Sequence, residues 1–204
     1  FGVGNTADAI RMHESINAVD IVDLNPEVYL LNPVFSFVNN HVLADRKIRL
    51  YVDDGRQFLK LTTNRYDLVT MEPPPPLHAG VSRLYSQEFY RDILSRLAPG
   101  GMVSQWLPEF NVTTPAVDLI MSTFAGSFPH SFAFVGSDRN LILVGSNEPF
   151  KLETLRARFS QEARVQTDLK RTNIERPADL LLPFLESPAS LQRKWTGGPI
   201  IRDG

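Results

Sequence analysis

The sequence predicts an α/β fold: a doubly wound, mostly parallel Rossmann-like sheet with an antiparallel edge hairpin, followed by a short helical tail. Apolar segments alternate with segments of helical periodicity over the first two thirds of the chain, as in parallel sheets whose strands are joined by helices. Two apolar segments near residues 132–144 flank turn-forming residues, which is typical of a hairpin. After residue 148, prolines separate short amphipathic segments. We therefore expect a Rossmann-like domain over residues 1–148, its first strand lying before Phe1, and a tail over residues 149–204 packed on the same domain.

The individual elements are predicted from caps, periodicity and breakers. Asn25 followed by Pro26 is a typical helix start, and Asp54 followed by Gly55 is a turn signal that ends a strand. Helices are expected over residues 6–15, 25 to the late thirties, 56–61, 87–97, 115–126, 152–159, 178–185 and 190–195. Strands are expected over residues 18–23, 48–53, 66–71, 102–107, 132–135 and 141–144.

Composition excludes several classes of protein. The 204 residues carry a net charge of −2, so neither a nucleic acid nor an anionic membrane is expected as a partner. No apolar run approaches the roughly 20 residues that span a bilayer. The absence of cysteine excludes disulfides and thiolate chemistry, and four scattered histidines argue against a histidine metal site. We expect a piece of a longer chain, because it opens on Phe1 within a glycine motif. A cytoplasmic location is the expectation, although the termini do not indicate it.

The stretch from Tyr66 to Tyr90 organises the chain. A buried strand is expected to end at Glu72, because Pro73–Pro76 cannot donate backbone hydrogen bonds and form a stiff loop. Ser86 is the expected cap of the following helix. A carboxylate at the C-terminal end of a central strand lies where open α/β sheets bind their ligands. The alternative is a surface acid in a proline-rich loop.

Four acids fall at or just after predicted strand ends, namely Asp23, Asp53, Asp54 and Glu72. In a parallel sheet these ends share one edge, which also carries Gly2 and Gly4. Glycines let a ligand approach the backbone, and an acid about 20 residues later suits a ribose diol. These patterns predict a nucleoside-type ligand, with Asp54 accepting from the adenine amine. Taken singly, a glycine pair in a loop and an Asp before Gly are each commonly just turns.

The reaction is less constrained by the residues. Glu72 can attract a sulfonium cation, and can position an amine nucleophile or take its proton. Tyr85 lies near the same loop, where it either packs in the core or lines a pocket for the amine. His78 is more often solvated than catalytic in such a loop.

Taken together, these residues resemble the spermidine synthase (polyamine aminopropyltransferase) family, within the class I adenosylmethionine-dependent transferase fold. The matching elements follow in family order over about residues 1–110: Gly2-Val3-Gly4, His13, Asp23-Leu24-Asn25, Asp45-Arg46, Asp54-Gly55, Tyr66-Asp67, the Glu72 loop, Leu84-Tyr85, Glu88-Phe89-Tyr90 and Pro99-Gly100-Gly101.

The resemblance implies contacts to the adenosyl ligand from Gly2, Gly4, Asp23, Leu24, Asp54, Gly55 and Glu72, and catalytic roles for Glu72 and Tyr85. It implies decarboxylated S-adenosylmethionine or S-adenosylmethionine as co-substrate, no permanently bound cofactor and no metal. The partner is a small-molecule amine or other acceptor, and a homodimer is compatible with the family.

Two positions depart from the family pattern. The second aspartate of the catalytic loop falls on Pro75, which cannot bind an amine, and Val3 replaces an acid in the glycine segment. The family's N-terminal hairpin domain is absent from these residues.

The leading hypothesis from the residues and the resemblance is an aminopropyltransferase-like enzyme. The alternatives are an S-adenosylmethionine-dependent methyltransferase, and a catalytically degenerate nucleoside-binding module.

Overall fold

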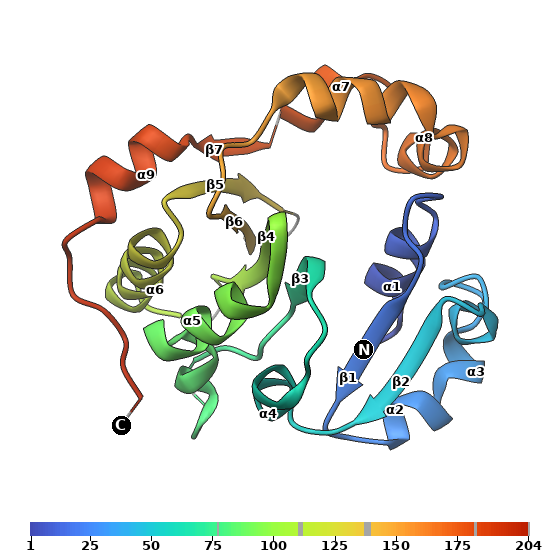
Figure 1. Ribbon diagram of the computed structural model, residues 1–204, viewed down its shortest axis with the longest axis horizontal. Helices are drawn as coiled ribbons and strands as arrows, with labels where there is room; N and C mark the ends of the chain where they lie inside the picture. The colour runs from blue at the N-terminus through green and yellow to red at the C-terminus, as the bar shows by residue number, and fades with distance from the viewer. Residues whose placement is uncertain (77, 110–111, 137–139, 182, 204) are drawn as a thin grey trace. The chain divides into compact units, whose positions relative to one another are not determined.

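The computed structural model describes residues 1–76, 78–109, 112–136, 140–181 and 183–203 (Figure 1). The chain forms two compact units. The first consists of Phe1–Leu61 with Lys151–Leu180, and the second of Thr62–Phe150 with Leu181–Gly204. Each unit is described by itself.

The first unit is built on two parallel strands, β1 (Val19–Asp23) and β2 (Ile48–Val52), paired so that Asp23 lies opposite Val52. Ala7, Ile21 and Val42 form its buried core, against which Phe1 and Tyr29 pack. The helices of this unit are α1 (Asn5–Arg11), α2 (Glu27–Leu30), α3 (Asn32–Phe35), the 3₁₀ turn η1 (Val42–Ala44), α4 (Gly55–Leu61), α7 (Leu152–Gln161) and α8 (Ala163–Lys170).

One long helix was expected from Asn25 to the late thirties, and this prediction is wrong in its continuity. The segment forms two short helices, α2 and α3, with Leu31 between them. Pro33 lies in the first turn of α3 and has no N–H to donate back to α2, so the hydrogen-bond ladder is interrupted there. The chain still winds in the helical sense, because Leu31 N–H donates to Glu27 O and Val34 N–H donates to Leu31 O.

The second unit contains a five-stranded sheet in the order β3-β4-β6-β5-β7. Its strands are β3 (Tyr66–Met71), β4 (Leu97–Pro108), β5 (His130–Val135), β6 (Asn140–Ser146) and β7 (Phe184–Glu186). The pair β3–β4 is parallel, whereas the pairs β4–β6, β6–β5 and β5–β7 are antiparallel. The predicted α/β class, with parallel strands and an antiparallel hairpin, is confirmed. The middle of the predicted hairpin loop, residues 137–139, lies outside the described residues.

Helices α5 (Gln87–Arg96), α6 (Thr114–Ser127) and α9 (Pro188–Trp195) and the 3₁₀ turn η2 (Val81–Tyr85) complete this unit. Ser86 caps α5 as predicted, since its hydroxyl oxygen accepts from Phe89 N–H at 3.2 Å. The rings of Tyr90, Phe124 and Phe128 pack together in the core. Gly145 of β6 lies against this cluster, and a Cβ there would meet the Phe128 ring at 2.6 Å.

The tail departs from prediction in one segment. A helix was expected over residues 178–185, but the chain forms the 3₁₀ turn η3 (Pro177–Leu181) and then strand β7. The cause is strand pairing, which the sequence of this segment alone does not predict. Strand β7 adds to the open edge of β5, and Val135 N–H donates to Pro183 O at 2.7 Å. Helix α8 was not predicted. Within the described residues, no helix has the length and apolar character needed to cross a membrane.

Candidate functional site

The C-terminal ends of β1 and β2 bring several predicted site residues to one edge of the first unit. Asp23 is the last residue of β1, and Asp53 and Asp54 follow β2 directly. Because the strands are parallel, these ends lie together, and Asp53 N–H donates to Asp23 O at 3.1 Å. We call this edge the acidic rim; it comprises Asp23, Leu24, Asp53, Asp54 and Gly55.

Asp23 is held by hydrogen bonds to both carboxylate oxygens. The backbone nitrogen of Phe1 donates to Oδ2 at 2.8 Å, and Asn25 N–H donates to Oδ1 at 2.9 Å. Burial acts to raise the pKa of Asp23, but the hydrogen bonds that its carboxylate accepts, from Asn25 N–H and Leu24 N–H among others, outweigh it and the pKa is lowered. A carboxylate oxygen has two lone pairs, so each oxygen can accept a further hydrogen bond. Asp23 is therefore ionised at neutral pH and fixed in orientation.

The glycine segment is tied to the rim. Gly4 has φ +85°, and a Cβ there would lie 2.8 Å from the Phe1 ring and 2.9 Å from Asn39 Nδ2, so its conformation and the space both require glycine. Gly2 has φ +57° with open space around it. The buried Asn39 donates from Nδ2 to Val3 O and to Asn32 Oδ1, at 2.7 Å each. Asn39 was not among the predicted residues, because its role depends on a contact 36 residues away.

Tyr29 is a second residue that sequence reasoning missed. Its hydroxyl lies 3.2 Å from Ile21 O and 3.0 Å from Tyr51 O, so it links β1 to β2 near their C-terminal ends. Burial, and then the charge of Asp23, raise the pKa of Tyr29 to about 12.

The outer part of the rim is open. Asp54 is exposed, and its Oδ1 accepts from Gln57 N–H at 2.9 Å, which caps α4. A Cβ at Gly55 would meet nothing within 4 Å. Leu24 is 72% exposed, an apolar side chain beside three acids. The rim thus offers carboxylates, an apolar contact and an uncovered backbone in one place.

The remaining predicted residues, Glu72 and Tyr85, lie in the second unit. Glu72 is exposed directly after β3, whose last residue, Met71, pairs with Gln105 of β4. The Tyr85 hydroxyl donates to the loop carbonyls, with Pro74 O at 2.9 Å and Pro73 O at 3.3 Å. Tyr85 is fully buried, and burial raises its pKa. The structure therefore places Tyr85 against the backbone of the Glu72 loop, with its hydroxyl engaged there.

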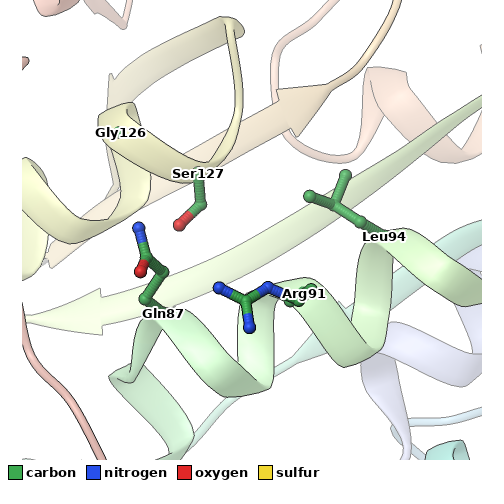
Figure 2. Close-up of a pocket in the computed structure, with 5 residues that line it drawn as sticks. All are labelled: Gln87, Arg91, Leu94, Gly126 and Ser127. Atoms are coloured by element: carbon green, nitrogen blue, oxygen red, sulfur yellow. The ribbon is translucent and has the colours of Figure 1, made fainter.

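His78, the remaining residue considered for this loop, is exposed. A pocket of about 190 Å³ lies between α5 and α6, lined by Gln87, Arg91, Leu94, Gly126 and Ser127 (Figure 2). None of the predicted site residues lines this pocket. In the described part of the chain, no group of three or more histidines and acids is arranged to hold a metal ion.

Comparison with known proteins gives a family match. Residues 2–135 match the family model described as the spermine/spermidine synthase domain. A polyamine aminopropyltransferase from Oceanobacillus iheyensis is 32% identical over 114 residues, which cover 53% of this chain and 22% of that protein. The chain thus spans less than a quarter of that relative's length.

Solved structures share the fold. The spermidine synthase from Thermotoga maritima superposes with a TM-score of 0.63 at 13% identity, covering 97% of this chain and 63% of that one. Human methyltransferase-like protein 13, solved in complex with SAH, gives a TM-score of 0.60 at 14% identity, covering 81% of this chain and 79% of that one. At these identities the likeness establishes the fold, which is that of class I methyltransferases and spermidine synthases.

Proposed function

Because the chain belongs to the spermine/spermidine synthase domain family, we propose that it is a transferase that binds an adenosyl co-substrate and passes an aminopropyl group to an amine. The observation that carries the proposal is the acidic rim with its attached glycine segment: an oriented carboxylate, an apolar side chain and open backbone lie together at one strand edge. This combination matches the polar and apolar parts of an adenosine.

The rim residues take separate roles in this proposal. Asp23 accepts hydrogen bonds from the two ribose hydroxyls, because both of its oxygens keep an acceptor position. Leu24 packs on the adenine, and Asp54 accepts from the adenine amine. Gly2, Gly4 and Gly55 let the ligand approach the backbone. The preferred co-substrate is decarboxylated S-adenosylmethionine, with S-adenosylmethionine as the alternative.

Glu72 carries the proposed chemistry. Its carboxylate orients the acceptor amine and takes the proton that the amine loses. The amine nitrogen forms a bond to the carbon next to the sulfonium sulfur, the carbon–sulfur bond breaks, and methylthioadenosine leaves with the electron pair. Most of the rate gain comes from holding nitrogen and carbon in line at near-attack distance. As a carboxylate, Glu72 also attracts a sulfonium cation.

Tyr85 supports Glu72 by holding the loop. Its hydroxyl donates to the carbonyls of Pro73 and Pro74, and prolines already restrict that backbone. A stiff loop keeps the Glu72 carboxylate in place with little loss of entropy when the amine binds. Of the two proposed catalytic residues, Glu72 therefore acts on the amine and Tyr85 positions Glu72.

A methyltransferase is the second candidate, and Val3 favours it. An acid in the glycine segment would repel the carboxylate of intact S-adenosylmethionine, and Val3 removes that repulsion. A third candidate, a nucleoside-binding module without activity, is favoured by Pro75, which leaves the loop with one acid where the family has two.

Calorimetric titration separates the three candidates. The intact protein is titrated with decarboxylated S-adenosylmethionine, S-adenosylmethionine and methylthioadenosine, and then incubated with putrescine for product analysis. The proposal predicts tighter binding of the decarboxylated ligand and formation of spermidine with methylthioadenosine. Tighter binding of S-adenosylmethionine would favour the methyltransferase. Binding of the decarboxylated ligand without turnover on any amine tested would leave only the nucleoside-binding module.

A further inference from the structure

The segment that follows α9 is bonded to two helices of the second unit. It comprises residues 197–203, and we call it the C-terminal strap (Figure 1). Its contact with α6 is close, since Ile201 N–H donates to Thr123 Oγ1 at 2.9 Å. A Cβ at Gly198 would lie 2.7 Å from Ser122 Oγ, so a larger residue there would displace that hydroxyl. The strap is therefore held against α6 by a hydrogen bond and by close packing.

The strap is also bonded to the first turn of α5. Gln87 N–H is one of the amide groups that an α-helix leaves without a partner at its start, and it donates to Ile201 O at 3.0 Å. Asp203 N–H donates to Glu88 Oε2 at 3.0 Å, and Arg202 Nη1 donates to Glu88 Oε1 at 3.3 Å. The last two contacts join residues 115 and 114 positions apart. The start of α5 is thus fixed by a distant part of the chain.

Ser86 is the point where the strap meets the segment before α5. Its side chain is fully buried, and its hydroxyl oxygen accepts from Phe89 N–H. The single hydroxyl proton has two acceptors within reach, Asp203 Oδ1 at 2.8 Å and Arg83 O at 2.9 Å. A carboxylate forms the stronger of the two hydrogen bonds, because it carries a charge. The Asp203 side chain therefore orients the Ser86 hydroxyl at the junction of η2 and α5.

This junction adjoins the residue that holds the Glu72 loop. Tyr85 is the last residue of η2 and directly precedes Ser86. Its ring is fully buried, and its hydroxyl donates to the carbonyls of Pro73 and Pro74. A closely packed ring cannot shift independently of the backbone that carries it. The place of the loop carbonyls therefore depends on how firmly η2 is joined to α5.

We propose that Asp203 is a positioning residue that acts on the Glu72 loop. Its carboxylate orients the Ser86 hydroxyl and thereby fixes the place where η2 meets α5. The Tyr85 hydroxyl, held at that place, then supports the loop backbone. The inference rests on the proposed transfer reaction, in which the loop carries the carboxylate that takes the proton of the amine.

Steady-state kinetics tests the effect on turnover. Asp203→Ala removes the side-chain contact alone, because the bonds of Asp203 N–H and Ile201 O belong to the backbone. With putrescine as acceptor, kcat should fall about 5-fold, less than the roughly 100-fold that a misplacement of about 1 Å can cost. KM for the adenosyl ligand should not change. Asp203→Asn keeps an oxygen that can accept from Ser86, so it should restore most of the lost kcat.

A matched control loosens the same tail at another point. The exposed Asp118 of α6 accepts from Trp195 Nε1 at 3.2 Å, next to the strap but away from α5. Asp118→Ala should therefore keep the kcat of the parent. An equal fall in kcat in Asp118→Ala and Asp203→Ala would overturn the role assigned to Asp203, because any loosening of the tail would then have the same effect.

A double variant tests the path through Tyr85. Tyr85→Phe already removes the hydrogen bonds to the loop carbonyls, so adding Asp203→Ala should lower kcat little further. If the two residues act independently, the two losses multiply. A kcat of the double variant equal to that product would overturn the path from Asp203 to the loop.

Amide hydrogen exchange follows the strap without the reaction. Asp203→Ala should speed exchange over residues 81–90, compared with the parent and with Asp118→Ala. Unchanged exchange would show that Asp203 does not order the junction, and faster exchange with an unchanged kcat would reduce the strap to a structural contact; either result overturns the proposal. A parent protein that transfers no aminopropyl group, but whose exchange responds as expected, would overturn the proposed function and the positioning role with it, and leave the contact between Asp203 and Ser86 established.

Discussion

The two units each pair a strand-end acid with a tyrosine, half-buried in the first unit and fully buried in the second, but they fix the acid differently. In the first unit, Asp23 itself receives hydrogen bonds on both oxygens, and Tyr29 links the strands beneath it. In the second unit, Tyr85 donates to the loop carbonyls beside Glu72, and the Glu72 side chain is exposed. The first arrangement fixes a carboxylate, and the second fixes the backbone that carries one.

This difference suits two kinds of work. A group that recognises a ground-state ligand gains from complete preorganisation, because a side chain that is already ordered loses little further conformational entropy on binding. A group that takes a proton must approach and leave its partner during the reaction, so a stiff backbone with an accessible side chain is the better support. The comparison predicts that changes at Asp23 affect affinity and changes around Glu72 affect turnover.

The largest expected effect comes from Glu72→Gln. Loss of the proton acceptor should lower kcat by about 10²–10⁴-fold, the range for a general base. Binding of methylthioadenosine, which has no positive charge, should stay the same in calorimetry. Glu153→Gln is the control, since Glu153 is an exposed acid on α7. A Glu72→Gln variant with full turnover would show that the exposed acid has no catalytic part.

The next effect is on recognition. Asp23→Ala should weaken every adenosyl ligand by about 1.5–3 kcal/mol, the scale of a charge-assisted hydrogen bond. Calorimetric titration with methylthioadenosine measures it without the sulfonium. Asp168→Asn on α8 removes a half-buried carboxylate of the same unit, which pairs with Arg171 and lies outside the rim, and serves as the control. Unchanged affinity in Asp23→Ala, with the variant folded, would remove Asp23 from the ligand site.

Local signals in the sequence predicted most of the framework. Apolar runs ending in Asp23, in Asp53 and Asp54, and in Glu72 gave the parallel strands, and Ser86 marked the start of α5. The errors arose where distant residues decide the outcome. Strand β7 forms because it pairs with the edge strand β5, and the sequence of Phe184–Glu186 alone does not predict that pairing. Pro33 was compatible with a helix start as well as a break, so the division between α2 and α3 was not determined locally.

The site shows the same limit. Parallel topology brings strand-end acids to one edge, so Asp23 and Asp54 could be grouped from sequence. Asn39 and Tyr29 could not, because an amide bonding Val3 O and a phenol bonding two strand carbonyls are contacts between segments far apart in the chain. The sequence therefore predicts residues that gather at a strand-end edge better than it predicts residues that hold those residues in place.

A smaller effect tests the support of the loop. Tyr85→Phe keeps the ring in the core but removes the hydrogen bond to the Pro73 and Pro74 carbonyls. The free energy of unfolding should fall by about 1 kcal/mol, and kcat should fall several-fold with little change in KM for the adenosyl ligand. Denaturant unfolding and steady-state kinetics measure the two effects. A change in KM alone would mean that Tyr85 acts in ligand binding and not in supporting turnover through the Glu72 loop.

The smallest effect tests the tyrosine of the first unit. Tyr29→Phe removes the link from β1 to β2 and should cost about 1 kcal/mol of unfolding free energy. Tyr51→Phe is the matched control, because the Tyr51 hydroxyl makes no hydrogen bond to any residue that the structure describes. Denaturant titration at neutral pH compares the two variants with the parent. An equal loss in both would mean that the Tyr29 hydroxyl does not link the strands.

Tyr29 also predicts a pH dependence with a definite sign. Its pKa is raised from 10.0 to about 12 in the folded chain, so the folded state keeps a proton that the unfolded state has lost. The stabilisation is therefore complete below pH 10 and declines as the pH rises through about 12. Unfolding measured across this range should show a decline that is shallower in Tyr29→Phe than in the parent or in Tyr51→Phe. Identical slopes in all three would mean that Tyr29 ionises as freely in the folded chain as in the unfolded one, against the hydrogen bonds that its hydroxyl makes to Ile21 O and Tyr51 O.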